Sequence, residues 1–306
     1  SLASETTVLL KRTQWLLILS LVLGMAMAPV ASVLAGTGCT ITTTIEDGRK
    51  FKADICVPNP GGGADYEMSF DLEFDVDPDD PGSLQNLTVP CVGFSVDVLD
   101  AGEIANIDSR LPDPANQAID PALPLRVTIE PPVGCGLAFK DDYDAEFDAT
   151  NLTWVAQSPY RLMKAPIGGS FVDITAEVTP GSVRSRGCSG TFSEFVMVVD
   201  SVQDYANEAI AAYADLGLAL NDNALGPTAR STLKSDHGVS QAAFVAGNYA
   251  EAIARLDDLK AHCGVLGGPA LPNAWRSARD LVNLEGELVS KTGHVRFLLG
   301  RLNGDP

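Results

Sequence analysis

The character of the chain changes near Asp200, and this change constrains the fold more than any other feature. Before Asp200, short runs of alternating apolar and polar residues are separated by Gly, Pro, Asn and Asp. A period of two is typical of half-buried strands, and frequent turn residues are typical of antiparallel sandwiches. No stretch with a helical period stands out there. The clearest runs are residues 39–45, 51–57, 66–76, 92–99, 125–130, 171–178 and 191–199.

After Asp200 the sequence becomes rich in Ala and Leu at helical spacing. Asn248 and Glu251 have the spacing of a capping box at the start of one helix, and Gly264 follows its last residue. Short connections between such helices favour a small bundle. We predict helices over 202–220, over 228–246 with a break near Gly238, over 248–263, and one long or two shorter helices over 273–302.

The two parts together predict a segregated α+β fold. We expect an N-terminal hydrophobic helix within residues 1–35 and an antiparallel β-sandwich of immunoglobulin-like type over 36–200. A small helical bundle is expected over 201–306.

The C-terminal segment contains a spacing of glycine and apolar residues that is known from another protein module. In this spacing the segment resembles the FIMAH-type helical module found at the ends of some secreted bacterial proteins. The resemblance implies an accessory module without catalytic activity, and it covers only the C-terminal segment. The residues that carry it are Gly247 and Asn248, then Ala252, Ile253, Leu256 and Leu259, and later Lys291, Thr292 and Gly293.

The first 35 residues have the features of a membrane-targeting segment. Lys11 and Arg12 precede residues 15–35, a run of 21 positions without a charge. A basic pair, an apolar run and small residues before Gly36 are the three parts of a secretory signal peptide. The run is also long enough to cross a bilayer core of about 30 Å, and we favour this transmembrane anchor. Either interpretation places the remaining chain on the periplasmic or extracellular side of a bacterial membrane, and cleavage would make it a secreted protein.

The chain has a formal net charge of −19 at pH 7. This charge disfavours nucleic acids and anionic lipid surfaces as partners, because both are negatively charged. It favours solubility, divalent cations and basic protein partners.

All six cysteines follow the apolar segment: Cys39, Cys56, Cys91, Cys135, Cys188 and Cys263. An even number outside the cytoplasm predicts up to three disulfides, and the spacing does not choose among the pairings. In the first hairpin, a three-residue loop places the five apolar residues of both strands on one face, and register usually follows the buried face. This register turns Cys39 and Cys56 to opposite faces, so we predict that they do not pair.

Two groups of carboxylates are candidates for binding a cation. Ca²⁺ takes six to eight oxygen ligands, and alternating aspartates at a turn can supply them. Pro78 and Pro81 interrupt the first group, so a solvated acidic turn without an ion is the alternative. A structural calcium ion is the one cofactor that the sequence suggests. The first group is Asp75, Asp77, Asp79 and Asp80, and the second, on a potential strand, is Asp141, Asp142, Asp144, Glu146 and Asp148.

The sequence has no HExxH, GxSxG, Walker or dinucleotide-binding motif. We therefore expect a non-catalytic accessory or scaffold subunit of a larger membrane complex, for example a respiratory or photosynthetic one. Its acidic face could attract a basic soluble electron carrier. The alternative is a secreted adhesin or surface-binding module with calcium-binding loops. A hydrolase with carboxylates on separate strands is a third hypothesis, since it leaves no linear signature.

Overall fold

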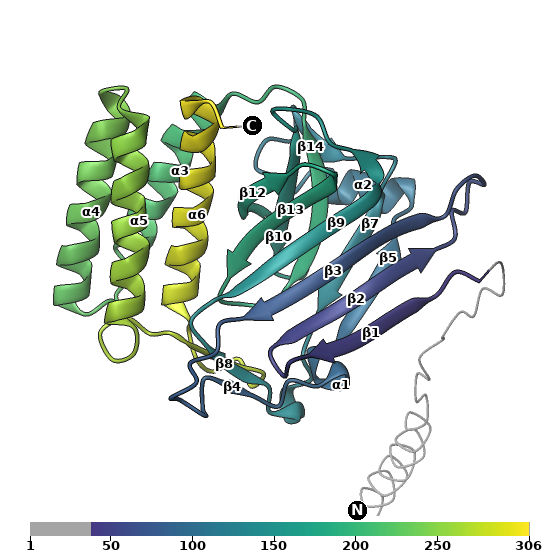
Figure 1. Cartoon of the computed structure of the whole chain (residues 1–306), viewed down its shortest axis with the longest axis horizontal. Helices are drawn as coiled ribbons and strands as arrows, with labels where there is room; N and C mark the ends of the chain where they lie inside the picture. Colours follow the sequence, from purple (N-terminus) through teal and green to yellow (C-terminus); the bar gives the residue numbers. More distant parts are fainter. Residues whose placement is uncertain (1–37, 306) are drawn as a thin grey trace, which may run out of the picture. The chain divides into compact units, whose positions relative to one another are not determined.

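Residues 38–305 are described by a computed structural model, with fifteen β-strands and six α-helices (Figure 1). One strand lies beyond residue 200, and the four long helices follow residue 204. This arrangement confirms the predicted mixed α+β fold with helices mostly in the C-terminal part. The hydrophobic helix predicted in residues 1–35 lies outside the described residues. From Cys39 onward the chain forms one compact unit. None of the helices in this part of the chain is both long and apolar enough to cross a membrane.

The first sheet has one apolar and one charged face. Phe51, Phe70 and Phe147 are fully buried on its inner face, because side chains alternate between the two faces of a strand. The residues between them are mostly charged and lie on the outer face. All neighbouring strands are antiparallel, in the order β1 Ile41–Glu46, β2 Lys50–Val57, β3 Tyr66–Phe74, β9 Tyr143–Thr153, β13 Ser182–Ser189 and β12 Thr175–Thr179.

The second sheet is buried on both faces, which explains the unbroken apolar run at 195–199. Phe195 packs on Phe70 of the first sheet, with 5.4 Å between ring centroids. Val196 and Val198 pack with Ile107 of helix α2 Ala101–Asp108 on the other face. Its strands follow the order β11 Val172–Asp173, β10 Tyr160–Ala165, β14 Glu194–Asp200, β7 Leu125–Ile129 and β5 Phe94–Val98, with β6 Gln117–Ile119 also paired to β14.

A small third sheet joins the two parts of the sequence. Strand β15 Ala274–Arg276, from the C-terminal part, pairs with β8 Ala138–Lys140, which also pairs with β4 Leu84–Gln85. Trp275 of β15 packs against Phe192, at 4.7 Å between ring centroids. Two short helical turns, α1 Val89–Val92 and a 3-10 turn at Val133–Cys135, lie in the connections.

The C-terminal part folds into four long helices, close to the predicted ranges. Helix α4 is not broken at Gly238, because one glycine in a helix costs only about 1 kcal/mol relative to alanine. Helix α5 continues through Gly264, and the last predicted segment contains β15 and one helix. The bounds are α3 Tyr205–Ala219, α4 Pro227–Val245, α5 Tyr249–Leu266 and α6 Leu284–Asn303.

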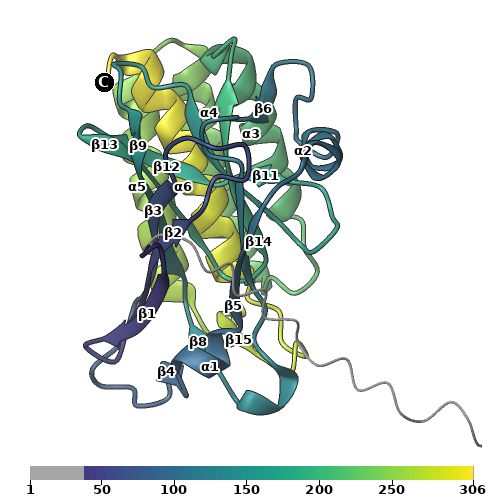
Figure 2. The same ribbon diagram turned by 90° about the vertical axis from the view of Figure 1, so that its right-hand side faces the viewer.

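Helix α6 covers the edge of the first sheet, where it contacts β12 and β13 (Figures 1 and 2). Gly286 of α6 lies directly against Gly190, which follows β13, and a Cβ on Gly190 would lie 2.9 Å from the Cα of Gly286. This cover protects an edge strand that would otherwise expose unpaired backbone groups. The two glycines allow the start of the helix to approach the sheet closely.

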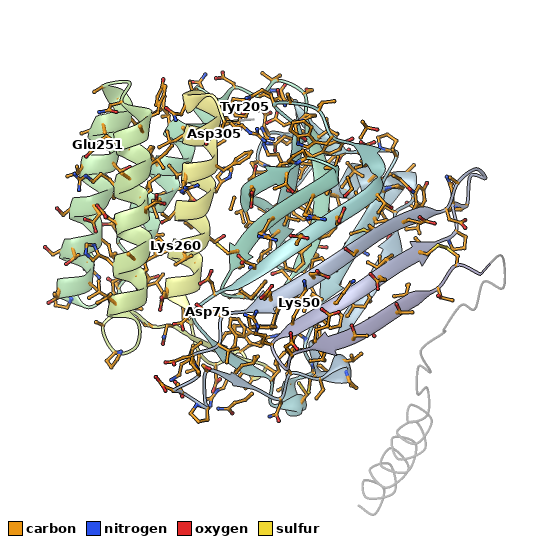
Figure 3. All side chains as sticks on the ribbon, in the orientation of Figure 1. Lys50, Asp75, Tyr205, Glu251, Lys260 and Asp305 are labelled. Carbon is orange, nitrogen blue, oxygen red and sulfur yellow. A yellow bond between two sulfur atoms is a disulfide. The ribbon has the colours of Figure 1, made fainter. Side chains whose placement is uncertain are left out.

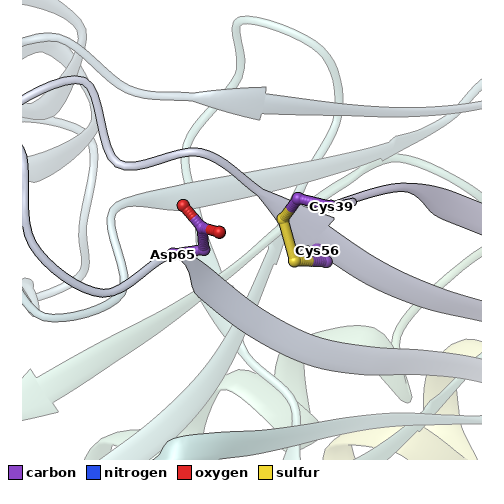
Figure 4. Close-up of side chains that lie close together, drawn as sticks. All are labelled: Cys39, Cys56 and Asp65. Carbon is purple, nitrogen blue, oxygen red and sulfur yellow. A yellow bond between two sulfur atoms is a disulfide. The ribbon is translucent and has the colours of Figure 1, made fainter. Parts of the chain in front are cut away.

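The first hairpin confirms the predicted register and corrects the predicted cysteine pairing. Residues 47–49 form the loop, and Ile45 lies opposite Phe51. Cys39 and Cys56 nevertheless form a disulfide (Figure 4). The ladder begins only at Ile41, so Cys39 precedes the strand and does not follow its alternation of faces. Cys91, Cys135, Cys188 and Cys263 are free thiols.

Candidate functional site

The first carboxylate group is a hydrogen-bonded turn after β3. Asp77 and Asp80 each accept a backbone N–H two residues further on, at 2.8 Å. Asp80 also accepts a hydrogen bond from Lys140 Nζ at 2.5 Å, and this cation lowers the pKa of the Asp80 carboxyl. Neither Asp75 nor Asp79 joins them in a group of three converging ligand atoms within residues 38–305. Only Cys39, Cys56 and Asp65 form such a group there, and its two sulfur atoms are joined in the disulfide (Figure 4).

The second carboxylate group lies mostly on the outer face of the first sheet and is paired with cations. Arg184 and Arg186 of β13 pair with carboxylates of β9. On the same sheet, Lys50 Nζ lies 2.6 Å from Asp71 Oδ2. Lys50 is labelled in Figure 3. Because they pair with cations on neighbouring strands, the alternating acidic residues help to hold the strands of this sheet together. Asp144, Glu146 and Asp148 are alternate residues of β9 and lie on the same face of the strand, as their spacing predicted.

The other two members of the second group lie where α6 meets the sheets. Asp141 accepts a hydrogen bond from Asn273 Nδ2 at 2.7 Å. Close to Asp141, Glu285 is 2% exposed, and its Oε2 has no hydrogen-bond partner among residues 38–305. Burial, followed by repulsion from the Asp141 carboxylate, raises the pKa of Glu285 to about 8. Burial also raises the pKa of Asp142 to about 6. Glu285 is therefore mostly protonated at neutral pH.

A groove follows the boundary between the strands and the helices, and we name it the junction groove. It consists of three adjoining hollows of about 280, 450 and 420 Å³, and Glu287 lines all three. Five apolar side chains that line it are between 42% and 70% exposed, and three of them line the same hollow. These are Ile167, Val172, Leu218, Leu281 and Val282.

The central hollow of the junction groove contains a buried lysine beside two hydroxyl groups. Lys164 is 8% exposed, and its Nζ lies 2.7 Å from Ser189 Oγ and 2.5 Å from Thr191 Oγ1. No carboxylate of the described residues is within salt-bridge distance of this Nζ. A buried amine without a counter-ion favours its neutral form. Burial accordingly lowers the pKa of Lys164 to about 7.

The strand alternation and the turn after β13 position these groups. Lys164 pairs with Phe195 across β10 and β14, and it lies on the same face as Leu162, toward the first sheet. Ser189 ends β13, and its neighbour Gly190 lies against α6. Tyr143 donates a hydrogen bond from its hydroxyl to the carbonyl oxygen of Thr191 at 2.6 Å, which fixes the turn.

The remaining charged groups of the central hollow mostly form pairs. Lys291 pairs with Asp215 of α3 and lies 3.8 Å from Glu287. His294 Nδ1 lies 3.4 Å from Asp173 Oδ1. A neutral amine beside two hydroxyls, within a ring of paired charges, can accept a proton or hydrogen-bond a ligand.

Sequence reasoning did not find Lys164, Ser189 or Thr191 as site residues. Lys164 is 25 residues from Ser189 along the chain, so they form no linear motif. The one available signal was a lysine within the apolar stretch Leu162–Ala165, since a charged residue inside a buried strand requires a partner.

A comparison with protein families gives one match. A model described as a family of unknown function, DUF6689, matches residues 21–303. The chain belongs to this family. The match includes both the strands and the four long helices of the described residues. No curated protein matches the chain significantly.

Proposed function

We propose that the protein is an extracytoplasmic accessory subunit of a membrane complex, anchored by residues 15–35, which binds an extended segment of a partner protein in the junction groove. The observation that carries the proposal is the row of exposed apolar side chains along this groove. Exposed apolar patches on soluble proteins commonly mark interaction sites. The absence of linear catalytic motifs in the sequence agrees with a binding role.

The charge of the groove favours a basic partner segment. Its carboxylates outnumber its permanent cations, which are Lys291 and Arg279, and burial lowers the pKa of Lys164 to about 7. The carboxylates are Glu130, Asp173, Asp215, Asp222 and Glu287. The whole chain adds long-range attraction through its net charge of −19. A partner segment with alternating basic and apolar residues fits both features. A basic soluble electron carrier is one protein of this class.

The two packed antiparallel sheets agree with an immunoglobulin-like sandwich as the body of this subunit, a fold used widely for binding outside cells. The alternative of a calcium-dependent adhesin has less support, because the carboxylates of Asp77 and Asp80 already accept backbone hydrogen bonds.

Binding of short fluorescent peptides to the purified chain tests this proposal. We expect a decapeptide of alternating Lys and Leu to bind, and one of alternating Glu and Leu not to bind, because of the acidic groove. The double variant Ile167→Ser, Val282→Ser should weaken binding by at least about tenfold, since it removes apolar contact area. Equal binding of both peptides would contradict the proposal.

The helices provide a matched control for this experiment. Val245 of α4 and Val265 of α5 are 79% and 82% exposed and do not line the groove. The double variant Val245→Ser, Val265→Ser should bind like the unchanged protein. In native membranes, a photo-crosslinking residue at 282 should join the chain to a partner subunit, and the same residue at 265 should not. Identical crosslinks at both positions would exclude the groove as the binding surface.

A further inference from the structure

The central hollow of the junction groove has the components of a serine–lysine acyl-transfer site. We propose that Ser189 is a nucleophile and Lys164 its general base, and that the site hydrolyses short-chain carboxylic esters. This activity goes beyond the proposed binding function and departs from the expectation of a non-catalytic protein.

The proposal depends first on the geometry of the pair. Lys164 Nζ lies 2.7 Å from Ser189 Oγ, which is within the range required for direct proton transfer. Both side chains are more than nine-tenths buried and line the same hollow. A serine hydroxyl is a weak nucleophile unless an adjacent base removes its proton, and lysine is the base in one recurrent variant of the catalytic triad.

The surroundings keep Lys164 in the state that a base requires. The charged groups that face it are Asp173 of β11, Asp215 of α3, and Glu287, Lys291 and His294 of α6. Burial has the largest effect on the pKa of Lys164 and lowers it. Lys291 also disfavours the positive charge on Lys164, whereas Glu287 and Cys188 of β13 favour it. With a pKa of about 7, a substantial fraction of the Lys164 amines is neutral and has a lone pair near neutral pH.

The hollow also has room for a substrate. Its volume of about 280 Å³ suits a small acyl group, and Val172, Ile174 and Ala212 form an apolar wall. Gly190, directly after Ser189, lines the same hollow. The backbone N–H after a nucleophile is a common oxyanion donor, and we assign this role to Gly190.

The reaction balances with water as the only co-reactant. Ser189 Oγ adds to the ester carbonyl carbon while its proton passes to Lys164 Nζ. The bond to the alcohol oxygen then breaks, and Nζ returns the proton to that oxygen. Water next adds to the acyl carbon and gives a proton to Nζ, which passes it to the departing Ser189 Oγ. The products are a carboxylic acid and an alcohol.

The decisive experiment treats the full chain, purified in mild detergent, with a fluorophosphonate probe and maps the adduct by peptide mass spectrometry. We expect one adduct, on Ser189, with a labelling rate that rises with pH around neutrality as Lys164 loses its proton. No adduct on Ser189 at pH 8.5 in folded protein would overturn the proposal. An adduct on Thr191 instead would also overturn it.

Two serine variants test whether Ser189 itself carries the activity. Ser189→Ala should abolish labelling and reduce hydrolysis of p-nitrophenyl butyrate by at least about 100-fold. Ser185→Ala is the matched control and should leave labelling and hydrolysis unchanged, because Ser185 is a fully buried serine of the same strand that does not line the described hollow. Thermal unfolding of each variant establishes that it is folded. Unchanged hydrolysis in Ser189→Ala would refute the assignment.

The failure of this proposal can be distinguished from failure of the binding function. Ser189→Ala leaves the apolar row of the groove unchanged, so it should still bind the Lys–Leu decapeptide. Peptide binding without an adduct on Ser189 would leave the binding function intact and remove the catalytic one. An adduct on Ser189 without peptide binding would support the catalytic function and remove the binding function.

Discussion

At the scale of single residues, the burial of Glu285, and not its residue type, sets the pKa of its carboxyl group. This residue is 2% exposed, one of its carboxyl oxygens has no hydrogen-bond partner in the described part of the chain, and its pKa is raised to about 8. The folded protein therefore holds this proton more tightly than the unfolded chain, whose glutamates have a pKa of about 4.3. The contribution of this proton to the free energy of unfolding is fully present below the unfolded pKa, and it is lost as pH rises through the folded pKa of about 8.

The raised pKa of Glu285 predicts the effect of Glu285→Gln. The variant keeps the shape of the neutral acid but cannot ionise, so it should be more stable than the unchanged protein by about 1–3 kcal/mol above pH 8. The advantage should shrink toward pH 5. Urea unfolding of both proteins at each pH measures it. Glu67→Gln, at an exposed position, is the control, and an advantage independent of pH would contradict the prediction.

The cysteines allow a second prediction at this scale. Cys91 Sγ lies 3.3 Å from the carbonyl oxygen of Cys135, and Cys135 Sγ lies 3.5 Å from that of Cys91. Cys188 and Cys263 are buried. Alkylation of the denatured, unreduced protein should therefore modify four cysteines. After treatment with oxidised glutathione, only Cys188 and Cys263 should react, because Cys91 and Cys135 are close enough to pair. Alkylation of Cys39 or Cys56 without reductant would contradict the structure.

At the scale of elements, local signals identified most helices and several strands. Asp100 and Glu103 form a capping box at the start of α2, with both reciprocal hydrogen bonds present. The sequence contains this signal, but the helix has only eight residues and its apolar period is short. Strand β15 lies within the range 273–302 that the sequence predicts to be helical, because three residues between turns carry too little periodicity to identify a strand.

The contact between α6 and the sheet leads to an element-scale prediction. A Cβ at position 286 would lie 2.8 Å from the backbone nitrogen of Gly190, and neither backbone can move away easily. Gly286→Ala should therefore lower the free energy of unfolding by at least about 2 kcal/mol, as overpacking does in protein cores. Thermal or urea unfolding measures the change.

Gly238 in the middle of α4 is the matched control for Gly286. It is exposed, and a Cβ there would meet no atom within 4 Å. Gly238→Ala should stabilise the protein by up to about 1 kcal/mol, since alanine has the higher helix propensity. Similar effects of the two substitutions would mean that α6 does not lie closely against Gly190.

At the scale of the whole molecule, strands and helices share one hydrophobic core. Residues such as Phe147 of β9 and Leu288 of α6 belong to the same cluster of buried side chains. A domain boundary at residue 200 follows the change in composition, but β15 and α6 both pack against elements that precede it. This organisation predicts one cooperative unfolding transition for residues 39–306.

Two probes in different parts of the molecule test that prediction. The fluorescence of Trp154, directly after β9, and of Trp275, in the small sheet that joins the two parts, reports on the strands. Circular dichroism at helical wavelengths reports on α3 to α6. Their unfolding curves should coincide, and a fragment ending at Asp200 should not fold cooperatively. Two separated transitions, or a soluble folded fragment, would show that the bundle is an independent domain.

The sequence alone determined the features that depend on neighbours along the chain. The change of character at Asp200 separated strands from long helices, and the buried-face argument gave the register of the first hairpin. Asn248 caps α5 as its spacing predicted. These features need only periods, turns and caps, which are encoded within a few residues of each other.

Only the tertiary structure decided which distant side chains meet. It joined Cys39 to Cys56 despite the strand alternation, and it paired the acidic residues of β9 with arginines of β13. It also placed Lys164 beside Ser189, where burial rather than residue type changes the proton affinity of the amine. Such contacts depend on the packing of whole sheets and helices, and desolvation acts only once that packing is complete.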